Sequence, residues 1–324
     1  MNILYLPIFE PGGVHETAIR NKRGLFDALV AWGCEVHECD YLAHVSDLEE
    51  QVSYTIHKFQ PDLMLTQLHG HEPVTVGMMQ RWRALRPSMR VVNWSGDSWR
   101  HGLTGEKYLP LVRQFDLQLI AAPDILPEYA ELGIKAAFWQ IAYEKPVGDL
   151  PDMPWYDVVF LGNAFTDERK QMMTMLRELD DISVGIYGDW EHADGYNCYD
   201  FGAGEALYQH AKVAIADNVY PDQQNYTSNR PIQILMAGGA TLLHQHVPKM
   251  NDLLGIKPAV HYIVWHDLDD LRFKVQYWVE QYDTGIQQAL VGRGQAYARA
   301  HHTYTERVRQ LFEELLPMVE GVGV

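Results

Sequence analysis

An alternation of short apolar runs with amphipathic helical patterns, repeated in both halves of the chain, constrains the fold more than any other feature. In the first half the apolar runs 2–8, 34–39, 63–68, 90–94 and 117–121 predict buried strands. Helical patterns fill the intervals: 48–59, 78–85, and a helix ending at Gly33 whose inner face carries Ile19, Phe26, Leu29 and Val30. This β-α-β-α order predicts a parallel sheet covered by helices on both faces.

A second alternation follows the segment 143–155, whose prolines and glycine indicate an interdomain linker. Asp267 is expected to cap a late helix, and Val308 to Leu316 carry the apolar face of the last one. Strands are predicted at 156–161, 182–187, 213–216, 240–243 and 262–265, and helices at 167–179, 205–210 and 230–237. The predicted fold class is therefore α/β, with two doubly wound halves and a ligand beyond the carboxyl ends of the strands.

Composition narrows the class of protein. The length of 324 residues fits two domains of roughly 150 residues, and a hydrophobic fraction of 47% supplies two cores. A formal net charge of −17 disfavours a broad surface for polyanions. Three cysteines argue against a disulfide framework, and the chain shows no signal peptide or apolar run long enough to span a membrane. We expect a cytoplasmic protein, and no pattern indicates its oligomeric state.

The stretch 228–243 carries the clearest chemical signal. Ser228 and Asn229 precede a helix that begins with Arg230 and Pro231, and a Gly-Gly pair ends it before a strand. Free N–H groups at a helix N-terminus favour phosphate, and a guanidinium adds a bidentate donor. The alternative is an ordinary capped helix with an arginine that faces solvent.

This stretch and the segments around it resemble the group 1 glycosyltransferases of GT-B fold, and most closely their spore-maturation-type (CgeB-like) subgroup. The resemblance covers most of 156–307, in order. Its motifs are Tyr156 to Asn163, Ile186 to Gly188, Arg230 to Gly239, Tyr262 to Leu271, Gly294-Gln295-Ala296 and His302 to Arg307.

The resemblance implies two Rossmann-like domains that face each other across a cleft. Residues 1–145 would form the acceptor-side domain and 146–300 the nucleotide-sugar-binding domain, and the helix in 301–324 would cross back to the first. The implied reaction moves a hexosyl or pentosyl group from a nucleotide-sugar to an acceptor hydroxyl with retention of configuration. The nucleotide-sugar is a substrate, and no cofactor is implied.

The donor residues follow from the same resemblance. The wider family's Glu-x7-Glu element corresponds to Asn225 and Gln233, so amides replace both carboxylates. An amide can bond a ribose hydroxyl, but without the strength that a charge gives. Gly162 and Asn163 would approach the donor, and Tyr187 and Gly188 would lie near its base. Tyr187 can equally be a packed aromatic at a strand end.

The acceptor-side candidates lie near predicted strand ends in the first domain. His15 or Asp97 would be the catalytic group, with Glu16 a weaker choice. Their alternatives are a polar helix-start residue for His15 and a turn-forming aspartate for Asp97. Gly12 and Gly13 would let the donor approach the backbone, and Trp99 would stack on a sugar or acceptor.

Metal binding is not expected. Asp267-Leu268-Asp269 has the D-x-D form of metal-dependent transferases, but Asp267 stands where a helix needs its N-cap. The histidine pairs lack a third ligand at a recognised spacing, and His69 and His244 are expected to line the cleft. The diphosphate leaving group would be stabilised by Arg230, with help from Arg169 or Lys170, although both also occupy positions of solvated helix charges.

Two other functions remain open. The acceptor can be a hydroxymethylated DNA base, as in phage-type DNA modification, if Arg81, Arg83, Arg86, Arg90 and Arg100 form a local basic groove. The amides at Asn225 and Gln233 also allow a non-catalytic domain that binds a nucleotide or glycan.

Overall fold

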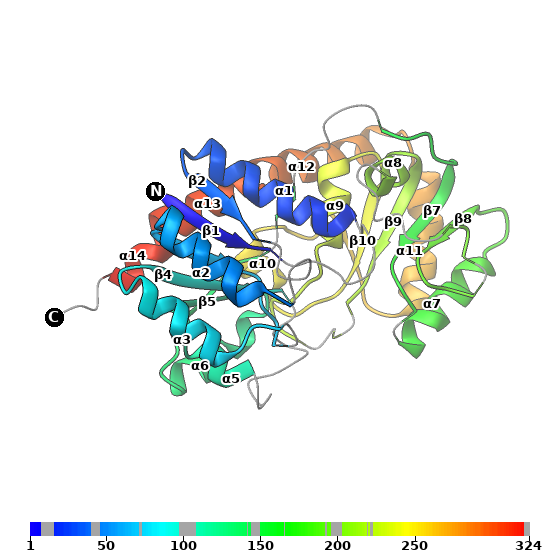
Figure 1. Ribbon diagram of the computed structural model, residues 1–324. Helices are drawn as coiled ribbons and strands as arrows, with labels where there is room; N and C mark the ends of the chain where they lie inside the picture. The colour runs from blue at the N-terminus through cyan, green and yellow to red at the C-terminus, as the bar shows by residue number, and fades with distance from the viewer. Residues whose placement is uncertain are drawn as a thin grey trace. The chain divides into compact units, whose positions relative to one another are not determined.

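The structure is a computed structural model that describes residues 1–7, 16–39, 46–70, 73–96, 108–140, 142–143, 150–164, 166–191, 193–195, 203–218, 220 and 223–320. The chain forms two compact units (Figure 1). Unit 1 contains Met1–Ala142 and Tyr304–Val324, and unit 2 contains Tyr143–Thr303. The predicted boundaries were 145/146 and 300/301. In the described part of the chain, no helix is long and apolar enough to cross a lipid bilayer.

Unit 1 is built on a parallel sheet of six strands in the order β2-β1-β3-β4-β5-β6. Because the chain turns back after β2, the order reverses between β1 and β3. Its elements are β1 Asn2–Leu6, α1 Glu16–Ala31, β2 Glu35–Glu38, α2 Leu48–Phe59, β3 Leu63–Thr66, α3 Val76–Leu85, β4 Arg90–Ser95, α5 Tyr108–Val112, β5 Leu117–Ile120, α6 Leu126–Glu131 and β6 Ala136–Phe138.

The C-terminal segment belongs to the core of unit 1. Helix α13 (Tyr304–Gln310) packs against α1, where the Tyr304 ring occupies the space beside Gly24. The Trp139 indole donates to the carbonyl of Arg307 at 3.1 Å, and Arg307 Nε donates to the carbonyl of Gln140 at 2.7 Å. Burial lowers the pKa of Arg307 to about 10. A π-helical turn Leu311–Leu315 and α14 (Leu316–Glu320) complete the segment.

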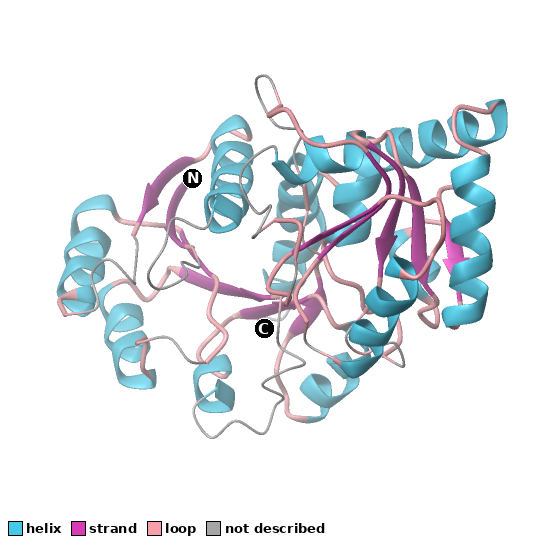
Figure 2. Ribbon diagram, turned by 90° about the vertical axis from the view of Figure 1, so that its right-hand side faces the viewer, coloured by secondary structure: helices cyan, strands magenta, loops and turns pink. Residues whose placement is uncertain are grey.

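Unit 2 repeats this plan with a parallel sheet of five strands in the order β11-β10-β9-β7-β8, and the strand order reverses between β7 and β9. Helices α7 and α11 pack together, and α8, α9 and α12 form a second group. Figure 2 shows helices in cyan on both sides of the strands, in magenta. The elements are β7 Tyr156–Leu161, α7 Asp167–Arg177, β8 Val184–Tyr187, α8 Ala203–Gln209, β9 Ala211–Ala216, α9 Arg230–Ala237, β10 Thr241–Gln245, α10 Met250–Leu254, β11 Ile263–Trp265, α11 Leu268–Glu280 and α12 Gly285–His301.

The α/β class and the doubly wound order are confirmed, and α2, β7 and α9 have the predicted bounds. The prediction for Val30 is wrong: it is 47% exposed, whereas its neighbour Leu29 is fully buried. Helix α1 turns its narrow apolar stripe to the core through Leu25, Ala28 and Leu29, and one residue further along the helix points to solvent.

Candidate functional site

Polar side chains gather at the carboxyl edge of the sheet of unit 2, where β7 and β9 lie side by side. Asn163 follows β7, Asp217 follows β9, and Arg169 lies in the first turn of α7. Arg230 begins α9. Open α/β sheets bind ligands at this edge, at the point where strand order reverses.

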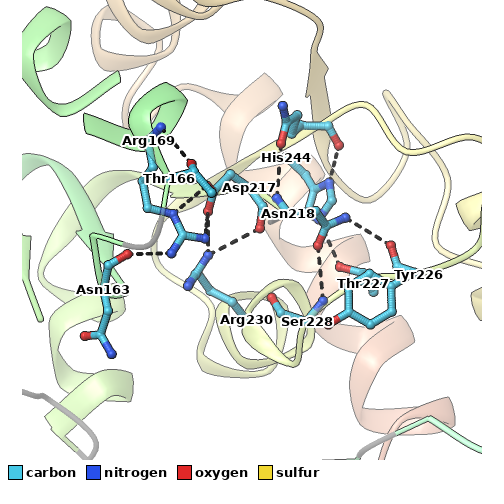
Figure 3. A network of polar contacts seen from close by, with 12 residues as sticks. Asn163, Thr166, Arg169, Asp217, Asn218, Tyr226, Thr227, Ser228, Arg230 and His244 are labelled. Atoms are coloured by element: carbon cyan, nitrogen blue, oxygen red, sulfur yellow. Dashed lines mark hydrogen bonds and ion pairs between the residues drawn. The ribbon is translucent and has the colours of Figure 1, made fainter. Parts of the chain in front are cut away.

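One carboxylate holds two guanidinium groups at this edge (Figure 3). Asp217 accepts from Arg169 Nε at 2.7 Å and Nη2 at 3.0 Å, and from Arg230 Nη1 at 2.8 Å. The side chains of Arg169, Asp217 and Arg230 are 3%, 7% and 12% exposed. Phe160 packs against both guanidiniums, 5.5 Å from that of Arg169 and 5.0 Å from that of Arg230. Two guanidiniums share one carboxylate, so the three groups of this Arg169–Asp217–Arg230 cluster carry a formal charge of +1 between them.

The helix that Arg230 begins has no side-chain cap. Thr166, Asp267 and Thr284 cap α7, α11 and α12 through hydrogen bonds to backbone N–H groups. Asn229 occupies the same position before α9, but it has helical dihedral angles and its side chain caps nothing. The first-turn N–H groups of α9 therefore add a partial positive charge beside Arg230.

Two further polar atoms lie near this helix start. The Oγ of Ser228 and the Oδ1 of Asn225 are buried, and neither has a hydrogen-bond partner among the described residues. Buried polar atoms normally form hydrogen bonds, so two that lack partners require an explanation. A bound ligand that forms hydrogen bonds with them is one. Ser228 is fixed through its backbone, since its N–H donates to Asn218 Oδ1 at 3.2 Å.

A buried histidine positions the segment before α9. His244 Nδ1 lies within hydrogen-bond distance of the carbonyl of Gln245, and its Nε2 is 3.1 Å from Thr227 Oγ1. Burial lowers the pKa of His244 to about 4, so the ring is neutral at pH 7. With Nδ1 donating to a carbonyl, Nε2 accepts from the Thr227 hydroxyl. The sequence-based expectation that His244 lines a cleft is wrong, because it is fully buried.

The glycine positions at the strand ends are dictated by close packing. A Cβ at Gly162 would collide with the guanidinium of Arg230, and a Cβ at Gly188 would collide with the carbonyl of Gly162. Asn163 accepts from Arg169 Nη1 through its carbonyl at 2.6 Å and from the N–H of Asp189 through Oδ1 at 2.9 Å. Tyr187 is 4% exposed, and its ring and hydroxyl meet those of Tyr156.

The two amides matched to the family's carboxylates differ in their surroundings. Asn225 adopts a left-handed conformation with φ of 59°, and its N–H donates to the carbonyl of Pro248 at 2.8 Å. Gln233 lies in α9 and is 8% exposed. No described residue makes a hydrogen bond with the Gln233 side-chain amide, so the group is available to a ligand.

Three sequence-based alternatives are resolved at this edge. Arg169 is not a solvated helix charge, because its side chain is buried in an ion pair with Asp217. Lys170 is exposed and, within the described residues, forms its ion pair with Asp167, at 3.0 Å. Asp267 caps α11 by accepting from the N–H of Asp270 at 2.8 Å. In the described parts of both units, no group of three or more metal-ligating side chains is present.

The acceptor-side candidates Gly12, Gly13, His15, Asp97 and Trp99 lie outside the described residues. The side chain of Glu16 lies outside them as well. Of the sequence-predicted site residues, Arg230 and Gly162 are brought into contact, and Ser228, Asn229 and Gln233 lie on or beside the same helix start.

Asp217, which joins the cluster, was missed by the sequence analysis. Its only local signal is its place directly after the buried strand Ala211–Ala216. Its pairing with Arg169, 48 residues earlier, needs the strand order of the sheet.

Comparison with known proteins adds to this geometry. Residues 169–313 match the family model described as glycosyl transferase-like. No curated protein sequence matches the chain. The structure of Anabaena Alr3699/HepE with UDP and glucose is 12% identical with a TM-score of 0.63, over 98% of this chain and 100% of that one.

Two further structures are similar over nearly the whole chain. Sucrose-phosphate synthase from Thermosynechococcus elongatus is 13% identical with a TM-score of 0.61, over 98% of this chain and 99% of that one. T4 phage BGT in complex with UDP-glucose is 10% identical with a TM-score of 0.61, over all of both chains. The fold is GT-B. Within this GT-B chain, the segment that matches the family model begins at Arg169 and includes Asp217, Asn225, Arg230 and Gln233.

Proposed function

We propose that the protein is a glycosyltransferase that holds the diphosphate of a nucleotide-sugar donor between Arg230 and the first turn of α9. The observation that carries the proposal is the unbalanced charge of the Arg169–Asp217–Arg230 cluster beside an uncapped helix start. A diphosphate would supply the missing negative charge, and its oxygens would accept from Arg230. The match of residues 169–313 to a glycosyl transferase-like model supports the same reading.

In the proposed reaction the bond between the anomeric carbon and the diphosphate breaks, and negative charge grows on the departing oxygen. Arg230 is oriented by Asp217 and packed on Phe160, so its remaining N–H groups need no rearrangement to stabilise that charge. Asp217 therefore acts as a positioning residue. In metal-dependent enzymes a metal ion stabilises the charge of the leaving group, and here fixed positive charge can do so. The proposed transfer is therefore metal-independent and requires no cofactor.

The donor's ribose would be bound by the amide of Gln233, which is buried and free to both donate and accept. HepE and T4 phage BGT were solved with UDP or UDP-glucose, and this favours a uridine nucleotide here. Retention of configuration, membership of the spore-maturation-type subgroup, and the roles given to His15, Asp97 and Trp99 remain parts of the proposal that follow from the resemblance in sequence.

The acceptor is proposed to be a hydroxyl-bearing molecule other than DNA. Three of the five arginines that would form a basic groove are paired with carboxylates: Arg81 with Glu49, Arg83 with Asp116 and Arg86 with Asp62. Such pairing cancels the positive charge that duplex DNA would need. A salt-dependent mobility shift on hydroxymethylated duplex DNA would favour the DNA acceptor instead.

Thermal shift with a panel of nucleoside diphosphates and nucleotide-sugars tests the donor site. We expect at least one diphosphate to raise the melting temperature. Arg230→Ala should lower the affinity about tenfold or more, because it removes a charge-assisted bond. The control is Arg272→Ala, which removes an arginine that is 43% exposed on α11.

A flat panel for the unmodified protein, or an equal response in both variants, would contradict the proposed donor site. Steady release of nucleoside diphosphate from a nucleotide-sugar would exclude a purely binding role. Binding without any release would favour the non-catalytic alternative.

A further inference from the structure

Unit 2 contains a pocket of about 420 Å³ that the proposed donor site does not use. It lies between the starts of α7 and α11, beyond the carboxyl ends of β9, β10 and β11. Its volume is within the range of about 300–1,000 Å³ that is usual for small-molecule sites. Arg169 and Asp217 line it, whereas Arg230 does not.

The two sites lie on different faces of the sheet. Residues alternate between faces along a strand, and Val213 and Ile215 of β9 pack in the core with residues of α7 and α11. Asp217 continues that alternation and reaches the pocket side. His244 belongs to the other set and meets Thr227 in the segment that leads to α9. The Arg169–Asp217 pair is thus a wall between the pocket and the start of α9.

Two hydrogen-bond donors in the pocket lining have no partner in the described part of the chain. Trp265 is 4% exposed, and its indole N–H is buried and unsatisfied. Gln245 accepts from the N–H of Asn218 through Oε1 at 3.1 Å, while no described residue accepts from its amide nitrogen. An oxygen atom of a bound molecule is the kind of partner that both donors lack.

The remaining lining groups are mainly acceptors. Glu168 and Asp267 line the pocket, and no described side chain forms an ion pair with either. The third lining carboxylate, Asp217, is already paired with Arg169 and Arg230, so the negative charge at the pocket comes from Glu168 and Asp267. This balance of charge repels phosphate.

The mixture of donors and acceptors selects one chemical class. A phosphate offers acceptors only, and an ammonium group offers donors only, so each leaves part of the lining unsatisfied. A hydroxyl group both donates and accepts, so a molecule with several hydroxyl groups can pair with both kinds of lining group. We propose that this pocket binds a neutral polyhydroxylated ligand, a saccharide, through Trp265, Gln245, Glu168 and Asp267.

Saturation-transfer NMR with the full chain and glucose, galactose, mannose, maltose and sucrose tests this site. At least one saccharide should bind at millimolar concentration. Trp265→Phe keeps the ring and loses the N–H, and Gln245→Glu keeps the acceptor for Asn218 and loses the donor. Each should weaken binding about three- to tenfold, as expected for one hydrogen bond. Trp278→Phe is the control, because Trp278 is similarly buried in the same unit and does not line the pocket.

Competition identifies the source of the saccharide. If UDP-glucose displaces it and UDP does not, the pocket holds the sugar of the donor, whereas no displacement by either indicates a separate saccharide. The proposal is overturned if none of the five saccharides binds, if binding is equal in the Trp265, Gln245 and Trp278 variants, or if inorganic phosphate or methylamine binds in their place. The diphosphate test at Arg230 does not depend on this result, so the two can fail separately.

Discussion

The two sheets share the same reversal of strand order but bury different polar groups. In unit 1, Thr66, Asn93 and Gln118 stand in register across β3, β4 and β5. Asn93 accepts from Thr66 at 2.7 Å and from the N–H of Leu68 at 2.8 Å, and it donates to Gln118 at 3.0 Å. In unit 2, the polar groups near the strand ends include charged ones: Arg169, Asp217 and Arg230, with side chains 3%, 7% and 12% exposed.

The two sets of polar groups differ in how completely their own hydrogen bonds and charges are matched within the set. The neutral row of unit 1 has its donors and acceptors matched internally, so it specifies the packing of the sheet. The three groups of the Arg169–Asp217–Arg230 cluster carry a formal charge of +1, and Arg230 bonds through Nη1 alone among the described residues. Buried polarity alone therefore does not distinguish the two sheets, and the proposed donor site rests on the imbalance of charge at the strand ends of unit 2.

The largest expected effect comes from breaking the charged cluster. Asp217→Ala leaves two buried guanidiniums without their carboxylate and should lower the free energy of unfolding by about 3–5 kcal/mol. Urea denaturation measures it. Asp167→Ala, which removes an exposed carboxylate paired with Lys170, is the control and should cost less than about 1 kcal/mol. Equal losses in the two variants would show that the cluster is not a structural centre of unit 2.

The next effect is a dependence of stability on pH that originates in unit 2. His244 has a pKa of about 4 in the folded protein, against an ordinary value of 6.5. Between these values the unfolded chain binds a proton that the folded protein does not, so acid favours unfolding. The contribution is complete above about pH 6.5 and falls toward pH 4 by about 3 kcal/mol in total.

Urea denaturation of the unmodified protein and of His244→Gln from pH 7 to pH 4.5 checks this. The difference in stability between the two should shrink as the pH falls, because the variant has no histidine to protonate at this position. His266→Gln, an exposed histidine after β11, serves as the control. A constant difference across the range would contradict the role of His244.

The smallest expected effect is on ligand affinity, and it tests whether the buried amides of unit 1 take part in binding. Asn93→Ala leaves the buried N–H of Leu68 without its acceptor and the hydroxyl of Thr66 with only the more distant carbonyl of Val92, at 3.5 Å, and should cost about 2 kcal/mol of unfolding free energy. Nucleoside diphosphate affinity, measured by calorimetry, should stay within about twofold, a difference of less than 0.5 kcal/mol. A large loss of affinity would mean that the amide row takes part in binding, and the contrast drawn between the two sheets would then fail.

The sequence predicts most of the fold, because buried parallel strands are continuous apolar runs and β7 and α9 carry local start and stop signals. The elements it misses are mostly short, like β6 (Ala136–Phe138), α5, α6 and α10, and the longer α12 contains Gly292 and Gly294. Gly294 lies against the carbonyl of His261, a packing reason that no local pattern reveals.

The site is less predictable than the fold. Arg230 and its helix start can be recognised locally, because phosphate-binding helix termini have a local pattern. The ion pair between Arg169 and Asp217 and the hydrogen bond between Thr227 and His244 join residues from different elements. Their partners are decided by strand order and by which face each strand residue occupies.

The most direct test of the central claim is a crystal structure with the nucleoside diphosphate that binds best in the thermal-shift panel. We predict phosphate oxygens within about 3.2 Å of the Arg230 guanidinium and of the first-turn N–H groups of α9. Arg230 should keep its bond to Asp217. A diphosphate bound elsewhere, with Arg230 contacting Asp217 alone, would contradict the account.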